Sequence, residues 1–198
     1  MISDIIFDTN DGLIVDVTSR NEFLLVDVSE FKTFKPINNQ DYDDLVLSVI
    51  RSATQKAEAY IKDFILTTNV ILYYKQALYD VQVPYANPVI STLISIDQQG
   101  EETTLTEGTA NDYIVLGHKY KDIRLFGYAY ESLKLTGTVG LWNQPSSVPH
   151  SIKDAIKQIA KYLFSNASGQ ALDIQLSASS GLPIQAELLL NEFVNYHA

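Results

Sequence analysis

The sequence predicts an α+β fold with a long N-terminal helix and C-terminal helices packed with a central antiparallel β region, plus an N-terminal β-hairpin arm. Three observations carry this prediction. Apolar residues recur with the helical period over residues 41–65 and again over residues 149–166. Between them, over residues 67–142, they alternate with the two-residue period of strands. Short Gly- and Pro-containing turns separate these strands and leave no room for crossover helices, which favours an antiparallel sheet.

Residues 1–28 are expected to form an extended arm, and residues 29–198 are expected to form one domain. The apolar segments 5–7 and 13–15 flank Asn10-Asp11-Gly12, which is a strong signal for a tight hairpin turn. A strand-like run, Phe23–Val28, follows. Ser29 is then placed to cap a short helix that Pro36 ends.

The helix expected over residues 41–65 begins at an acidic cluster. Asp41, Asp43 and Asp44 lie at its positive end, where carboxylates stabilise the helix dipole. Glu58 and Lys62 are spaced for an ion pair on the outer face. The apolar stripe comprises Val46, Val49, Ile50, Ala53, Ala57, Tyr60, Ile61 and Phe64.

The β region contains six segments rich in β-branched and aromatic residues. They are residues 70–74, 79–83, 89–96, 113–116, 123–126 and 133–139. Glu101 and Glu102 are expected in a turn between two of these strands.

Two helices are expected after the β region. The first covers residues 149–166, and its apolar stripe comprises Ile152, Ala155, Ile156, Ile159, Ala160, Leu163 and Phe164. Lys153, Lys157 and Lys161 recur on another face; they form either a solvated surface or a docking surface for the acidic residues 1–44 of a neighbouring copy. The second helix, residues 183–196, carries Leu188, Leu189 and Phe193.

Composition narrows the possible functions. The net charge is −10, and residues 1–44 hold ten acidic residues against three basic ones. The chain therefore lacks the basic footprint of a sequence-independent nucleic-acid binder. It has no cysteine, which excludes disulfides, thiolate metal sites and cysteine nucleophiles. No apolar run approaches 18 residues and the first residues do not resemble a signal peptide, so we expect no membrane association.

No pattern typical of catalysis is present. The sequence has no phosphate-binding loop, no histidine pair at helical spacing and no nucleophile elbow. We therefore predict no catalytic residue, cofactor or metal site, and a protein that is not an enzyme. Trp142, the 12 tyrosines and the adjacent Glu101 and Glu102 leave one alternative open, a small acidic carbohydrate-binding or hydrolytic domain.

Five segments, taken in order, resemble the phage head–tail connector (adaptor) proteins of the gp6-like type. They are Leu24–Lys32, Asp43–Ile61, Pro88–Gly100, the stretch from Gly140 through Val148-Pro149 to Ile156, and Leu182-Pro183 followed by Leu188-Leu189. Their order and spacing carry the resemblance, which covers most of residues 24–195. Residues 1–23 have no counterpart in the family pattern, and Trp142 stands where a tyrosine is more usual.

The resemblance implies a non-enzymatic virion protein that is made in the host cytoplasm and located in the neck. Such proteins form a homo-oligomeric ring, typically of twelve copies, below the portal protein. The ring extends the DNA channel, lets DNA pass without specific binding, and offers a docking surface to stopper or tail proteins. The C-terminal segment engages the portal, which assigns that contact to Leu188, Leu189 and Phe193. A tail-completion or tail-tube-associated protein is the alternative within the virion.

Overall fold

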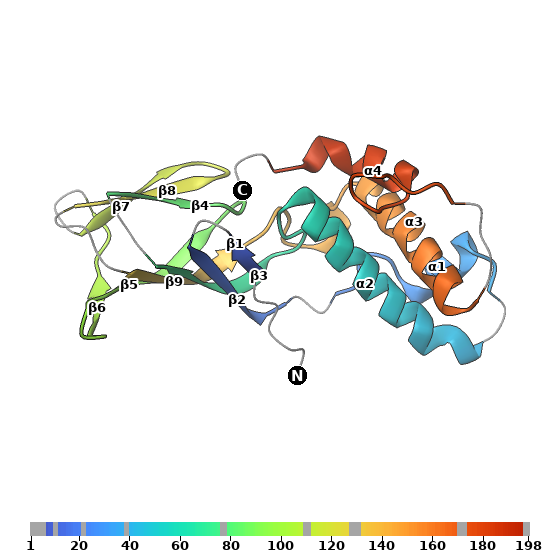
Figure 1. The fold of residues 1–198 in the computed structure, drawn as a ribbon, viewed down its shortest axis with the longest axis horizontal. Coiled ribbons are helices and arrows are strands. Elements are labelled where there is room, and N and C mark those ends of the chain that lie inside the picture. Colours follow the sequence, from blue (N-terminus) through green and yellow to red (C-terminus); the bar gives the residue numbers. More distant parts are fainter. Residues whose placement is uncertain are drawn as a thin grey trace. The chain divides into compact units, whose positions relative to one another are not determined.

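The computed structural model describes residues 7–9, 12–20, 23–37, 40–75, 79–108, 112–126, 132–169 and 174–195. The chain divides into two compact units, which we call the β unit (residues 1–21 and 66–143) and the helical unit (residues 22–65 and 144–196). Helices and antiparallel sheets confirm the α+β class (Figure 1). The division does not coincide with the predicted boundary after residue 28, because the first hairpin is part of the β unit.

The β unit contains a six-stranded antiparallel sheet in the order β1-β2-β3-β9-β5-β6. Its strands are β1 (Phe7–Thr9), β2 (Leu13–Ser19), β3 (Thr68–Tyr74), β5 (Val89–Ile96), β6 (Glu102–Leu105) and β9 (Ser132–Val139). The predicted N-terminal hairpin is present, since Thr9 pairs with Leu13, but β2 also pairs with β3 and so belongs to the sheet. The predicted strand start at residues 5–6 and the turn residues 10–11 lie outside the described residues.

A second sheet in the β unit has three antiparallel strands in the order β4-β8-β7. They are β4 (Asp80–Val83), β7 (Tyr113–Gly117) and β8 (Lys121–Leu125). Figure 1 shows the two sheets as separate layers. Buried side chains alternate along the strands of both, which is the two-residue period that the sequence displays. Their apolar faces form the core of this unit, which includes Val15, Val70, Leu72, Val81, Val83, Leu93, Ile123, Leu133 and Leu135.

The helical unit is built from α2 (Asp43–Ile61), α3 (His150–Ala167), α1 (Val28–Phe34) and α4 (Ile184–Leu190). Helix α3 packs against both α2 and α4, and α1 packs against α2 (Figure 1). Three 3₁₀ helices accompany them: η1 (Gln40–Tyr42), η2 (Pro145–Ser147) and η3 (Asn191–Phe193). The predicted stripe of α3 is its buried face, apart from the half-buried Leu163. No helix in the described part of the chain is long and apolar enough to span a membrane.

The predicted C-terminal helix over residues 183–196 is shorter than expected. It comprises α4 and then η3, because the chain leaves helical geometry at Val194. Its last predicted position, residue 196, lies outside the described residues.

The end of α2 corrects the predicted Glu58–Lys62 pair. Glu58 is buried at 8% exposure, and its Oε1 accepts the backbone N–H of Ile65 at 3.1 Å. Lys62 leaves the helix in the left-handed conformation with φ of 57° and is exposed. The helix therefore ends four residues earlier than predicted. The Glu58 carboxylate accepts a hydrogen bond from the turn after the helix and does not form an ion pair with the exposed Lys62.

Two further predictions are corrected at the strand level. Phe23–Val28 forms no strand: Leu25 and Val26 are buried in the helical unit and α1 begins at Val28, with Asp27 at the N-cap position. A strand-like run needs a neighbouring strand, and the packed helices supply none here. Glu102 begins strand β6 and pairs across to Ile96, so only Glu101 belongs to the turn.

Candidate interaction surfaces

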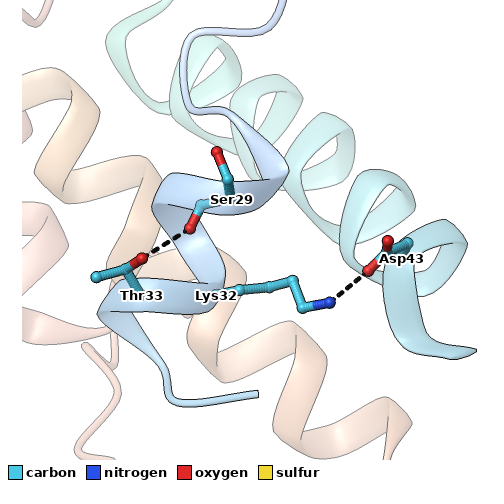
Figure 2. A network of polar contacts seen from close by, with 4 residues as sticks. All are labelled: Ser29, Lys32, Thr33 and Asp43. Atoms are coloured by element: carbon cyan, nitrogen blue, oxygen red, sulfur yellow. Dashed lines mark hydrogen bonds and ion pairs between the residues drawn. The ribbon is translucent and has the colours of Figure 1, made fainter. Parts of the chain in front are cut away.

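Helix α1 is tied to the start of α2, as Figure 2 shows. Lys32 Nζ lies 2.6 Å from Asp43 Oδ1, and the hydroxyl of Thr33 donates to the carbonyl oxygen of Ser29 at 2.9 Å. Ser29 thus contributes its carbonyl group to α1 and does not cap it with its side chain, contrary to the sequence expectation. One member of the acidic cluster at the start of α2 is therefore partnered within the chain.

The lysines of α3 lie beside α1 of the same chain. Lys157 Nζ is 3.0 Å from Glu30 Oε1 on α1 and 2.8 Å from Asp154 Oδ1. Burial alone would lower the pKa of Lys157, but the hydrogen bonds and charges of Asp154 and Glu30 outweigh it and raise the pKa above its ordinary value. Lys157 is therefore already paired with the acidic N-terminal segment of its own chain.

The ring of Phe34 on α1 lies close to two of these lysines. The Nζ atoms of Lys157 and Lys161 are 5.8 and 5.9 Å from its centroid, near the outer limit of a cation–π contact. Phe34 itself is 39% exposed. Lys153 is half-buried on the same helix. An aromatic ring and cationic groups thus share one surface of the helical unit.

Lys35 adds a further positive charge that the sequence analysis missed. Its Nζ lies 2.6 Å from Ser165 Oγ and 4.4 Å from the centroid of the Phe164 ring. Burial lowers the pKa of Lys35, and the charge of Lys161 lowers it further. Within the described residues, no carboxylate lies within 4.0 Å of the Nζ of Lys35 or of Lys161. We call Lys35, Lys157 and Lys161 the lysine cluster.

The C-terminal segment carries an exposed apolar patch. Leu188 is 66% exposed on α4, and Ile184, one turn earlier, is 40% exposed. Leu176 is also 40% exposed and reaches this region because it forms a β-bridge with Pro183. Of the predicted contact residues, only Leu188 is fully on the surface, since Leu189 and Phe193 are half-buried. We call Leu176, Ile184 and Leu188 the C-terminal patch.

Backbone hydrogen bonds hold the C-terminal patch in place. The N–H of Ile184 donates to the carbonyl of Gln175 at 3.1 Å, and the N–H of Asn195 donates to the carbonyl of Ile61 at 2.7 Å. On the other face of α4, Ala186 and Leu190 are fully buried. The exposed leucine is thus presented by a segment that is anchored at both ends.

The Glu187 carboxylate is a pH-sensitive anchor of this segment. The hydroxyls of Ser177 and Ser180 lower its pKa, and Ser180 Oγ donates to it at 2.7 Å. A lowered pKa in the folded state gives stability that is present above the pKa of the unfolded glutamate and is lost as pH falls through the folded pKa. We expect amide hydrogen exchange in residues 177–190 to accelerate, relative to α2, as the pH falls through the lowered pKa of Glu187. Glu187→Gln should show the faster exchange already at pH 7, and equal exchange in both proteins at pH 7 would contradict this.

The histidines and the residues that suggested a hydrolytic domain, Glu102 and Trp142, do not lie together in one site. His118 lies in the β7–β8 turn and His150 begins α3, both exposed, while His197 lies outside the described residues. Glu102 pairs with Lys134 at 3.4 Å, and Trp142 is half-buried. Across the described ranges, no group of three or more His, Asp or Glu side chains is placed to hold a metal ion.

One polar hollow of about 540 Å³ opens on the β unit. It is lined by Ser19, Arg20, Thr67, Asn69 and Asn143, which come from separate segments and show no common sequence signal. Asn69 Nδ2 donates to Ser19 Oγ at 2.6 Å, and Thr67 Oγ1 donates to Asn143 Oδ1 at 2.9 Å. Four of the five lining side chains thus bond to one another in two pairs.

Solved structures share this fold, although no protein-family model and no curated protein matches the sequence. One is the neck of an empty GTA particle computed with C6 symmetry, with a TM-score of 0.65, 14% identity, and coverage of 90% of this chain and 94% of that chain. Another is the neck of a native GTA particle computed with C12 symmetry (TM-score 0.61, 15% identity, coverage 90% and 93%). A third is the virion of a native gene transfer agent (GTA) particle (TM-score 0.56, 14% identity, coverage 90% and 94%). The chain therefore has the fold of a protein found in these particles.

Proposed function

We propose that this chain is a structural, non-enzymatic neck protein of a phage-like particle and forms the head–tail connector (adaptor) ring below the portal. The observation that carries the proposal is the shared fold, which extends over 90% of the chain in structures of particle necks. The ordered sequence segments that resemble the adaptor family support the same role independently. In this role the protein is made in the host cytoplasm and works in the virion.

A ring of twelve copies is the assembly that we propose. Neck structures with this fold have C6 and C12 symmetry, which supports a closed ring of identical copies. DNA passes through such a ring. The net charge of −10 supports passage without specific binding, because a surface short of basic groups does not hold phosphates tightly.

The C-terminal patch is the surface that we propose for the portal. Leu188 and Ile184 present apolar side chains from an anchored helix, and burying them against a partner removes apolar area from water. Leu189 and Phe193 would border this contact. The opposite side of the ring would receive stopper or tail proteins.

The lysines of α3 are proposed as a second contact, with acidic groups of a neighbouring copy. Among the described residues no ion pair involves Lys153 or Lys161, whereas Lys157 pairs with Glu30. The half-buried Lys35 and Lys161 raise each other's electrostatic energy, so an incoming carboxylate would relieve this repulsion.

Leu188→Asp is expected to weaken portal binding at least tenfold while leaving the fold intact. The side chain is 66% exposed, so its loss costs the isolated chain about 0.5 kcal/mol or less. In the complex it would forfeit about 1.5–3 kcal/mol of apolar burial and introduce a charge. Titration of the portal with each variant measures this. Gln185→Asp, also exposed on α4, is the matched control. Wild-type affinity for Leu188→Asp would contradict the assignment.

Mass measurement of the full chain, alone and mixed with the portal protein of the same particle, tests the proposed function. We expect a ring of about twelve copies bound to the portal. A chain that stays monomeric in the mixture would refute the proposal. A tail-completion protein would be absent from tailless heads, whereas an adaptor would be present in them, so their protein content separates these two roles.

A further inference from the structure

Strand β5 has an open edge over half of its length. On one side it pairs with β9 from Val89 to Ile96, whereas β6 covers its other side only from Leu93 to Ile96. Within the described residues, no strand pairs with that side of residues 89–92. Val89 is 60% exposed, and Ser91 and Thr92 are exposed as well. Backbone groups on this side of residues 89–92 are thus without a strand partner in the described part of the chain.

The open edge lacks the charges that normally protect such edges. Natural proteins place lysines or inward-pointing charges on exposed edge strands so that they do not pair with other chains. The whole of β5, Val89–Ile96, contains no charged residue and is rich in β-branched side chains. A register irregularity between Ile90 and Thr92 bends the strand, which is itself a device that hinders edge pairing, but it adds no charge. An uncharged edge strand rich in β-branched residues is suited to pair with a strand of another chain.

A second open edge lies in the other sheet of the same unit. Among the strands that the structure describes, β7 pairs with β8 and ends the three-stranded sheet. On its outer side, Gly108 donates to the carbonyl of Tyr113 at 2.8 Å, but within the described ranges no strand continues this pairing along Ile114–Gly117. These four residues are also uncharged, and Leu116 is 37% exposed.

We propose that the open edge of β5, residues 89–92, pairs antiparallel with the open edge of β7, residues 114–117, of a second copy of this chain, with Thr92 opposite Ile114. The two edges have equal length, both lack charge, and both display an exposed apolar side chain. Edge pairing supplies backbone hydrogen bonds, and the alternate side chains supply specificity. The proposal rests on the proposed function.

A second copy is the occupant that fits both edges. Contacts between two different surfaces of identical chains are heterologous, and they close into a ring when the rotation permits. Each copy then covers the β5 edge of one neighbour and offers its own β5 edge to the other. The C6 and C12 symmetry of neck structures with this fold agrees with such a repeat. A partner of another kind would leave one of the two edges open in every subunit.

Cysteine cross-linking tests the pairing, because the chain contains no cysteine of its own. Thr92→Cys with an affinity tag is mixed with untagged Ile114→Cys, at high protein concentration, both alone and with the portal protein, and oxidised mildly. Paired strands bring Cα atoms to about 4.5–5.5 Å, within the range that a disulfide spans. The tagged Thr92→Cys mixed with Gln99→Cys is the control, since Gln99 is exposed but lies in the turn after β5.

We expect a mixed disulfide dimer at ten times the control yield or more, and a ladder of higher species from the Thr92→Cys/Ile114→Cys double variant. A yield no higher than the control would overturn the pairing. Mass measurement of the wild-type chain with the portal runs in parallel. Rings without the cross-link refute the edge pairing alone, whereas the absence of rings refutes the proposed function.

Discussion

Replacing Ile156 with aspartate is expected to prevent the helical unit from folding. Ile156 lies in the middle of α3 and is fully buried. Removing a buried isoleucine side chain costs about 2–5 kcal/mol, and an unpaired buried carboxylate adds several kcal/mol. A typical domain is stable by about 5–15 kcal/mol, and this sum matches or exceeds the lower half of that range.

Soluble yield and far-ultraviolet circular dichroism measure the effect of Ile156→Asp. Asn166→Asp introduces the same side chain at an exposed position of the same helix and should change stability by about 0.5 kcal/mol. Ile156→Val should cost only about 0.5–1.5 kcal/mol, because it removes one methylene group. A soluble Ile156→Asp protein with an unchanged melting temperature would show that this face of α3 is not core.

The helices could be predicted from the sequence because each one is defined by its own periodicity. The stripe from Ile152 to Phe164 fixes both the location of α3 and its buried face, whatever packs on it. Phe23–Val28 is an apolar, strand-like run but becomes a loop and the start of α1. A strand requires a partner strand at the right place, and that information is not contained in the segment itself.

The candidate surfaces were predictable to different degrees. Spacing alone places Leu188 on α4, and its exposure agrees with a contact role. Leu176 joins the same patch only through its bridge to Pro183, which no local pattern reveals. For the same reason, the helical spacing of Lys157 predicts a lysine face but not that Glu30 of the same chain pairs with it.

Gly140→Ala is expected to destabilise the β unit by about 3 kcal/mol or more, for two reasons that act together. Its φ of +140° is a conformation that residues with a side chain rarely adopt. A Cβ at this position would also lie 2.6 Å from the carbonyl oxygen and 2.8 Å from the carbonyl carbon of Leu66, which are backbone atoms. The neighbouring backbone has little freedom to move, because the N–H of Thr67 donates to the carbonyl of Trp142 at 2.9 Å.

Two other glycines separate these causes. Gly100 has φ of +84° with open space around it, so Gly100→Ala measures backbone strain alone, about 1–2 kcal/mol. At Gly137, whose φ lies outside the left-handed region, an added Cβ would lie 2.2 Å from the carbonyl oxygen of Val89, so Gly137→Ala measures steric overlap alone, about 1–3 kcal/mol. Urea unfolding followed by the fluorescence of Trp142, the one tryptophan of the chain, reports on this region. Because strain and overlap arise together at one residue in Gly140→Ala, its loss of stability should exceed that of Gly100→Ala, and a loss no larger than that of Gly100→Ala would show that Leu66 yields to the added methyl group.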